Sequence, residues 1–342
     1  MHVVPIAPPH LDTNERPSCA VRVNNEANNA LNGILSGSAD FNRSLSEELN
    51  SMRTTSQHDN IVLACTEQPG ELRAQDDETD LGFRGFVSLS FPLLSDTHTA
   101  EAVFTYVDDF SPGVFEVVLD AARSAMAARQ RTTLFVRMNI STDGLETDPR
   151  CTLLRDAGFE LGLVEQASEL DLALVTDPVL PEGLKSVYFD GWMPPEEHIE
   201  SFLRVMEKGW ADVPSAEELE PQTWTRDMIE ELHELNAKST KSIANALLVD
   251  SEGIAAYSCA TLEPDRLELV SQQFTFVDRR VRGHGLGMLI KKVLYRELKD
   301  RYPALKRVTT YNALNNERML AVNEKLGLQP KFHQTTWKLA LS

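Results

Sequence analysis

The chain contains an internal repeat, and this repeat limits the possible folds more than any other feature of the sequence. Phe104–Asp108 reads FTYVD, and Phe274–Asp278, 170 residues later, reads FTFVD. The same order of elements is expected after each segment, namely a helix, a strand and a short helix. These short helices end at Ala157–Phe159 and Leu326–Leu328, which are 169 residues apart. The sequence therefore predicts two copies of one α/β domain.

Length and composition fit two globular domains. At 342 residues the chain is longer than a usual single domain, and its apolar content of 42% suits ordinary packed cores. The net charge of −19 disfavours nucleic acid as a partner, because binding to a phosphate backbone requires clustered lysine and arginine. We interpret the acidic excess as a contribution to solubility, with attraction of a cationic amine substrate as the alternative.

The cysteines and the N-terminus indicate a compartment. The four cysteines are scattered, without a C-x-x-C pair or a Cys/His cluster. This spacing argues against a disulfide framework and against a bound metal, and it favours a reducing compartment. No signal peptide is apparent at the N-terminus, and no apolar run is long enough to cross a membrane. We expect a cytoplasmic protein without a membrane partner.

A glycine-rich turn follows the second copy of the repeated strand. After Phe274–Val277 come a charged turn, the sequence RGHGLG from Arg282 to Gly287, and a helix-forming run. Glycines allow backbone amides to approach a phosphate closely, and the start of a helix favours negative charge. Positive charge is added to this stretch by Arg279, Arg280, Arg282, Lys291 and Lys292. The stretch predicts a pyrophosphate site, and a plain tight turn is the alternative.

Two common phosphate loops do not fit this pattern. A Walker loop ends in Lys-Ser or Lys-Thr, and neither dipeptide follows Gly287. A dinucleotide loop spaces its glycines as G-x-G-x-x-G, whereas Gly283, Gly285 and Gly287 alternate. The pattern resembles instead motif A of the GNAT superfamily of acyl-CoA-dependent N-acyltransferases, Q/R-x-x-G-x-G/A. Arg282, Gly285 and Gly287 fill that motif, with Val277 five residues before the arginine.

A second block supports the same resemblance. The segment Thr309–Leu328 is similar to the next block of the superfamily, a strand followed by an N-x-x-M/A helix start and a Leu-Gly helix end. Its positions are filled by Asn316, Met319, Asn323, Leu326 and Gly327. Arg279 departs from the pattern, because it stands where the superfamily has a proline. The duplicated chain resembles tandem GNAT proteins of the mycothiol-synthase-like kind, which commonly pair a degenerate copy with an active one.

The resemblance implies a fold class and domain boundaries. It implies an α/β fold, with a mixed α+β sheet, in two tandem GNAT-type domains. Each domain is expected to have a mostly antiparallel sheet, one splayed pair of parallel strands and flanking helices. The predicted divisions are a mobile tail over residues 1–18, a degenerate GNAT-like domain over 19–176 and an N-acetyltransferase domain with an acetyl-CoA site over 177–342.

The resemblance also implies a function. We expect an N-acetyltransferase that moves an acetyl group from acetyl-CoA, its co-substrate, directly to the primary amine of a small molecule, in a monomer or homodimer. By resemblance, acetyl-CoA contacts Phe276, Val277, Arg282, Gly283, His284, Gly285, Leu286, Gly287 and Asn316. A non-catalytic sensor that binds CoA or a metabolite is the alternative, and a mycothiol-synthase-like acetyltransferase is a narrower one.

The proton-transfer groups are less defined by the resemblance. Many GNAT enzymes have a tyrosine where Asn323 stands, and asparagine cannot protonate a departing thiolate at neutral pH. Tyr311, at the end of the neighbouring strand, is the candidate acid, with solvent as the alternative acid and plain packing as the alternative role of the tyrosine. Glu268, on the strand leading to Val277, is the candidate base, and an ordinary solvent-facing role is its alternative. Three tryptophans are candidates for lining the amine side or for plain packing: Trp192, Trp210 and Trp224.

The first copy lacks the chemistry of the loop. Opposite Arg282–Gly287 stands Pro112–Val117, which has one glycine, no arginine and a glutamate that would repel a phosphate. Phe115, opposite Gly285, would hold the backbone away from a ligand. We therefore expect no CoA binding in this copy. Glu169–Val175 is expected to close the sheet of the first copy.

Overall fold

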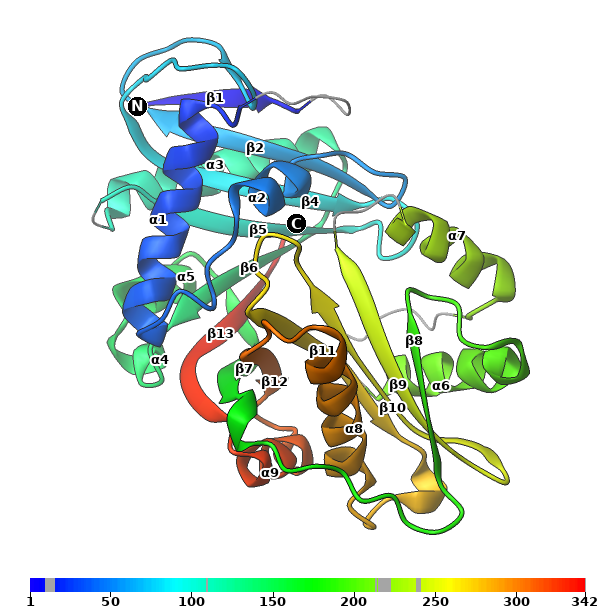
Figure 1. Ribbon diagram of the computed structural model, residues 1–342. Helices are drawn as coiled ribbons and strands as arrows, with labels where there is room; N and C mark the ends of the chain where they lie inside the picture. Colours follow the sequence, from blue (N-terminus) through cyan, green and yellow to red (C-terminus); the bar gives the residue numbers. More distant parts are fainter. Residues whose placement is uncertain (10–15, 109, 213, 215–222, 238–240, 342) are drawn as a thin grey trace. The chain divides into compact units, whose positions relative to one another are not determined.

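Each copy of the repeat folds into a β-sheet with helices on both faces (Figure 1). The computed structural model describes residues 1–9, 16–108, 110–212, 214, 223–237 and 241–341. The first unit comprises the described residues of Met1–Val164 and those from Phe332 onward, and the second comprises those between Glu165 and Lys331. The predicted mixed α/β fold class is confirmed.

The first unit contains the N-terminal copy. Its strands are β1 His2–Ala7, β2 His58–Thr66, β3 Leu72–Arg73, β4 Phe83–Pro92, β5 Thr99–Tyr106, β6 Thr133–Ile140 and most of β13, Gln329–Ala340. Its helices are α1 Cys19–Ser36, α2 Leu45–Ser51, α3 Pro112–Ala128, α4 Gly144–Thr147 and α5 Pro149–Asp156. Helix α3 packs on β2, β4 and β5, and α1 packs on β4, β5 and β6.

The second unit contains the C-terminal copy. Its strands are β7 Glu160–Asp171, β8 Lys185–Asp190, β9 Ser242–Asp250, β10 Gly253–Leu262, β11 Leu269–Val277 and β12 Arg307–Ala313. Strand β7 belongs to this unit from Glu165 onward. Its helices are α6 Ile199–Ala211, α7 Arg226–Ala237, α8 Leu286–Arg301 and α9 Glu317–Leu326, with 3₁₀ turns at Leu172–Leu174, Glu196–His198 and Arg279–Val281. None of the helices in the described part of the chain is long and apolar enough to span a membrane.

Each sheet is mostly antiparallel around one central parallel pair. The strand order is β3-β1-β2-β4-β5-β6-β13 in the first unit and β7-β12-β11-β10-β9-β8 in the second. The central parallel pairs are β5 with β6 and β11 with β12, and the short β1 and β3 are also parallel. The predicted arrangement around a parallel pair is therefore confirmed in both copies.

The last strands of the two copies are exchanged between the units. By the repeat, β7 corresponds to β13, yet β13 pairs with β6 in the first unit, from His333 opposite Ile140 to Ala340 opposite Thr133. Strand β7 pairs with β12 in the second unit, from Glu165 opposite Ala313. The prediction that Glu169–Val175 closes the first copy's sheet is therefore wrong. Trp337, which is 1% exposed, places the C-terminal end of the chain in the core of the first unit.

Part of the predicted mobile tail, residues 1–18, forms a strand. His2–Ala7 forms β1, which pairs antiparallel with β2 and parallel with β3. Val4 and Ile6 are buried in the apolar cluster beneath α1, and this burial explains why the segment is ordered. The compact units also divide between Val164 and Glu165, ahead of the predicted boundary at residue 176.

A β-bulge distinguishes the two copies of the repeated strand. Strand β10 pairs with β11 in two registers, with Cys259 opposite Phe274 and Ala260 opposite Gln272, so Gln273 is an extra residue. The pairing of β4 with β5 has no such shift. Because side chains alternate along a strand, one extra residue reverses which face each later side chain meets. Phe274 therefore faces the apolar cluster of α6 and α7.

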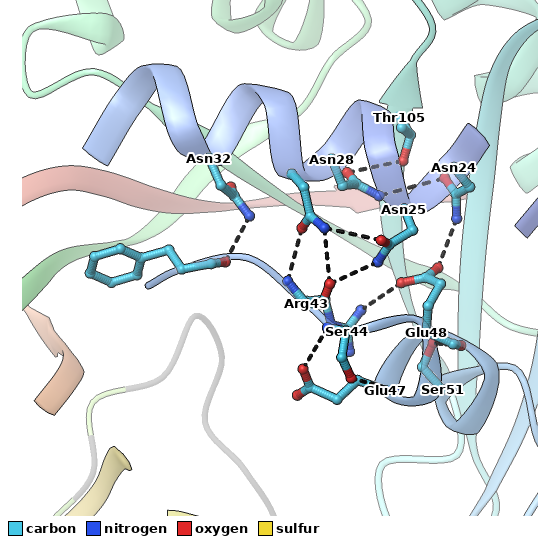
Figure 2. Close-up of polar contacts among 12 residues, drawn as sticks. Asn24, Asn25, Asn28, Asn32, Arg43, Ser44, Glu47, Glu48, Ser51 and Thr105 are labelled. Carbon is cyan, nitrogen blue, oxygen red and sulfur yellow. Dashed lines mark hydrogen bonds and ion pairs between the residues drawn. The ribbon is translucent and has the colours of Figure 1, made fainter. Parts of the chain in front are cut away.

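The face of the first unit that α1 covers is held largely by asparagines (Figure 2). Asn24 donates to the buried Glu48 carboxylate at 2.8 Å, and Asn32 donates to the Phe41 carbonyl at 2.9 Å. Asn28 accepts from the Thr105 hydroxyl of β5 at 3.1 Å. Burial raises the pKa of the Glu48 carboxyl, although Arg43 and Asn24 oppose this effect. These side chains join α1 to α2, to the segment between those helices and to β5, and their role is structural.

Candidate functional site

The glycine loop leaves an open space ahead of helix α8. Gly283 and Gly285 have φ angles of 87° and 76°, the left-handed region in which other residues are strained. A Cβ added to either glycine would meet nothing within 4 Å. The loop therefore combines a backbone that favours glycine with space that a ligand can occupy.

The backbone amides of this loop are available as donors. Helix α8 begins its hydrogen bonding with the Leu289 amide, which donates to the Gly285 carbonyl at 3.1 Å. In the described part of the chain, the amides from Gly283 to Met288 donate to no other group, and Gly285 provides no side-chain cap. These amides and the helix dipole together favour an anion at this position.

Two arginines beside the loop share one carboxylate. Asp212, just after α6, accepts from Arg279 at 2.7 Å and from Arg282 at 2.6 Å. Burial acts to raise the pKa of the Asp212 carboxyl, but the bonds from Arg282 and Arg279 outweigh it and lower that pKa. The Arg282 Nε also donates to the Val277 carbonyl at 2.9 Å. Arg282 thus ties the end of β11 to the loop, with a carboxylate paired to its guanidinium.

The parallel strands beside this loop separate and form a fork. Strands β11 and β12 are paired from Leu269 opposite Arg307 to Ser271 opposite Thr309. Beyond Ser271, β11 continues with β10 alone, and beyond Thr309, β12 continues with β7. The fork is the gap between residues 272–277 of β11 and residues 310–313 of β12. The Thr310 hydroxyl donates to the Gln272 carbonyl at 3.3 Å where the strands begin to separate, and beyond this contact no described strand pairs with the inner edges of the fork.

The loop and the fork are adjacent. A Cβ on Gly287, in the first turn of α8, would lie 3.7 Å from Val277 Cγ2 and 3.8 Å from Val322 Cγ2 of α9. The bulge at Gln273 turns the Val277 side chain toward α8, where it packs against that helix's cluster. The site therefore combines the unpaired amides of the loop with the apolar side chains of Val277 and Val322 beside them.

The corresponding space in the first unit is filled. Without a bulge, Phe104 and Tyr106 face α3, where the Phe104 ring packs edge-on against Phe115 at 6.1 Å between centroids. Phe115 occupies the position of Gly285 in the repeat and is 3% exposed. The remaining cavity, about 10 Å³, has room for about one water molecule. These side chains leave the first copy without a space like the one at the glycine loop of the second.

The structure brings most predicted cofactor-binding residues together. Phe276 and Val277 end β11, the loop follows, and Leu286 begins α8. His284 is exposed and its Nδ1 lies 3.3 Å from the Val281 carbonyl. Asn316 caps α9, because its Oδ1 accepts from the Met319 amide at 3.3 Å.

The two candidate catalytic residues differ in position. Tyr311 lies on the part of β12 that borders the fork, on the opposite face from Asn312. Glu268 lies before β11, on the far side of the paired residues from the fork, and forms an ion pair with Lys306. The structure thus places Tyr311 at the fork and does not bring Glu268 there.

A buried polar network behind the fork was not foreseen from the sequence. Lys291 is 1% exposed, and its Nζ donates to Asn323 Oδ1 at 2.7 Å. Asn323 Nδ2 in turn donates to Asn312 Oδ1 of β12 at 2.5 Å. Burial lowers the pKa of the Lys291 ammonium to about 7. The prediction that Lys291 adds positive charge at the loop is therefore wrong. Lys291 lies four residues after Gly287 and four before the buried Tyr295, and this spacing could have indicated that it lies on the inward face of α8.

Two of the three candidate tryptophans, on the face of the second unit's sheet that α6 and α7 cover, pack against each other. Trp192 and Trp224 stack with centroids 5.9 Å apart, within the apolar cluster of α6 and α7. The Trp210 side chain lies outside the described residues. A polar hollow of about 230 Å³ lies between α6 and Arg280, and Asp250 is ion-paired with that arginine at 2.6 Å. The hollow lies beside the loop on its α6 side.

The fold of the whole chain is similar to that of solved tandem GNAT proteins. A tandem GNAT protein from the clavulanic acid biosynthesis pathway, in a structure without acetyl-CoA, has a TM-score of 0.70 and 18% identity over 99% of this chain and 98% of that one. A GCN5-related N-acetyltransferase from Sphaerobacter thermophilus has a TM-score of 0.67 and 13% identity over 99% and 95% of the two chains. One from Kribbella flavida has a TM-score of 0.51 and 13% identity over 94% and 95%.

No family model and no curated protein sequence matches the chain. The similarity is therefore one of structure, at identities below one fifth. The chain has the tandem GNAT fold. The resemblance inferred from the loop and the Asn316 block is confirmed at the level of the fold.

Proposed function

We propose that this protein is an acyl-CoA-dependent N-acyltransferase that transfers an acetyl group from acetyl-CoA to the primary amine of a small molecule. The observation that carries the proposal is the open glycine loop at the start of α8, next to a fork between parallel strands. The loop amides from Gly283 to Met288 suit a pyrophosphate, and the open edges of β11 and β12 suit an amide-containing arm. The tandem GNAT fold supports this assignment.

The proposed reaction is a direct transfer. The amine nitrogen bonds to the thioester carbonyl carbon, the carbon–sulfur bond breaks, the amine loses a proton and the leaving thiolate gains one. Tyr311, on the face of β12 opposite Asn312, is our candidate for the group that supplies this proton. The second unit would carry the reaction, because Phe104, Tyr106 and Phe115 fill the equivalent space in the first.

The amine acceptor is proposed as a class. A fungal protein region with the same fold, at a TM-score of 0.55 and 12% identity over 84% of this chain and 34% of that one, is named a glucosamine N-acetyltransferase region. That example is compatible with a small, polar amine. One observation favours the alternative of a CoA-binding sensor: Asn323, which lies where many GNAT enzymes have a tyrosine, is buried and bonded to Lys291.

Release of free thiol from acetyl-CoA, measured with a thiol-reactive dye over a panel of small primary amines, tests the proposal. We expect amine-dependent release with at least one member of the panel and only slow hydrolysis without amine. Tight binding of acetyl-CoA without release on any amine would favour the sensor. Absence of both binding and release would contradict the proposed function.

A further inference from the structure

Burying the Lys291 side chain costs free energy, and its hydrogen bonds indicate what this lysine does. In the described part of the chain, its Nζ has one hydrogen-bond partner, Asn323 Oδ1, and no ion-pair partner. A leucine or methionine on this face of α8 would avoid the cost of removing an amine from water. The neighbouring buried polar group on the same face, the Tyr295 hydroxyl one turn later, has no partner at all among the described residues.

The chemistry of lysine fixes the direction of the hydrogen bonds in this network. Lys291 Nζ donates in its contact with Asn323, so the Asn323 atom that meets it is the carboxamide oxygen. The Asn323 nitrogen is then the atom that meets Asn312, and it donates to the Asn312 carboxamide oxygen. In its charged form Lys291 can only donate, and that form favours this orientation of the two carboxamides, whose oxygen and nitrogen atoms are otherwise easily interchanged.

This orientation leaves one donor without a partner at the fork. With Oδ1 engaged by Asn323, the Nδ2 group of Asn312 has no partner within the described chain. Asn312 lies three residues beyond Thr309, the last residue of β12 that pairs with β11. Its side chain shares a face of β12 with Val308, which packs under α8. The free amide therefore lies on the α8 side of β12, in the part of the strand that borders the fork.

We propose that Lys291 and Asn323 are positioning residues for Asn312, whose Nδ2 donates a hydrogen bond to a carbonyl oxygen of the thioester ligand in the fork. This inference rests on the proposed function. The acceptor is either the thioester carbonyl itself or an amide carbonyl of the pantetheine arm. Both are neutral oxygen acceptors that a carboxamide donor matches.

Calorimetric titration of the full chain with two ligands tests this inference. The ligands are acetyl-CoA and S-ethyl-CoA, a thioether that lacks the thioester carbonyl. We expect Asn312→Ala to weaken acetyl-CoA binding about tenfold, the effect of losing one hydrogen bond in a buried site. Asn312→Asp should weaken it at least as much, because the carboxylate still accepts from Asn323 but has no donor for the ligand.

Lys291→Met tests the positioning role. We expect this variant to bind acetyl-CoA more weakly than the wild type does. The double variant Lys291→Met/Asn312→Ala should bind acetyl-CoA no more weakly than Asn312→Ala alone, since both substitutions remove the same interaction. Lys299→Met is the matched control: it lies on the same helix, two turns farther from the loop, and its Nζ bonds the Leu172 carbonyl at 3.3 Å. Circular dichroism of each variant establishes that it is folded.

The two ligands identify the acceptor. A loss for acetyl-CoA without a loss for S-ethyl-CoA assigns the bond to the thioester carbonyl, and an equal loss for both assigns it to the pantetheine arm. Unchanged binding of both ligands by folded Asn312→Ala and Asn312→Asp would overturn the inference while leaving the proposed function intact. A normal Lys291→Met would overturn the positioning role. Failure of the wild-type chain to bind either ligand would instead overturn the proposed function and this inference together.

Discussion

Gly285→Trp is expected to abolish acetyl-CoA binding, lowering the affinity by at least about a hundredfold, or ~3 kcal/mol. A Cβ at Gly285 meets nothing within 4 Å, so the indole would extend into the space ahead of α8 without disturbing the core. There it would cover the amides from Gly283 to Met288, which are the proposed donors to the pyrophosphate. Titration calorimetry with acetyl-CoA measures the loss directly.

Gly183→Trp is the matched control for this substitution. Gly183 has a φ of 85°, close to the 76° of Gly285, and a Cβ there also meets nothing within 4 Å. The two variants thus share the backbone strain and the added indole, and they differ in position within the same unit. We expect Gly183→Trp to bind acetyl-CoA as the wild type does. Equal binding by the two variants, at wild-type affinity, would show that the loop does not hold the ligand.

Lys291→Met is expected to change how the free energy of unfolding depends on pH. Burial lowers the pKa of Lys291 from 10.5 to about 7 in the folded state. Between these two values the unfolded chain binds more protons than the folded chain, so the contribution of Lys291 makes the wild type more stable as pH rises, by up to about 1.4 kcal/mol per pH unit. Below pH 7 the wild type bears the full cost of the buried charge.

The variant should therefore be more stable than the wild type at pH 6, and its advantage should shrink by about 4 kcal/mol between pH 7 and pH 10. Urea unfolding at a series of pH values, for the wild type, Lys291→Met and Lys299→Met, measures the difference. Other titrating groups cancel in the comparison because the chains differ at one position. If the difference in free energy of unfolding between the wild type and Lys291→Met stays constant over this range, the pKa of Lys291 is not lowered by burial.

Much of the fold was predictable because the repeat fixes the order of elements. The strand that ends at Val277, the glycine loop and the helix after it follow one another as expected. Local sequence determined these elements. The place of the glycine loop, between β11 and α8, was therefore predictable as well.

The orientation of side chains near the fork was not predictable. Phe104 and Phe274 occupy equivalent places in nearly identical sequences, yet they face opposite sides of their sheets. The cause is the extra residue Gln273, and a bulge depends on pairing with the neighbouring strand rather than on the strand's own sequence. The exchange of β7 and β13 was hidden for a similar reason, since the two strands are equivalent in the repeat and either could complete either sheet.

The buried lysine was misinterpreted because a lysine near a glycine loop suggests phosphate binding. Its position on the inward face of α8 follows from helical spacing relative to Gly287 and Tyr295, but its partners come from β12 and α9. Only the tertiary structure brings Asn312 and Asn323 together with Lys291. The same holds for Asp212, which pairs with Arg279 and Arg282. Asp212 lies 70 residues before Arg282 in the sequence, so only the fold brings them together.

The number of acetyl-CoA molecules bound per chain tests the central proposal most directly, namely that a tandem fold carries one working site. Calorimetric titration of the full-length chain should give one site, located in the second unit and lost in Gly285→Trp. The filled space around Phe115 excludes a second site of the same kind in the first unit. A stoichiometry of two, or binding that survives Gly285→Trp, would contradict the proposal, as would no binding at all.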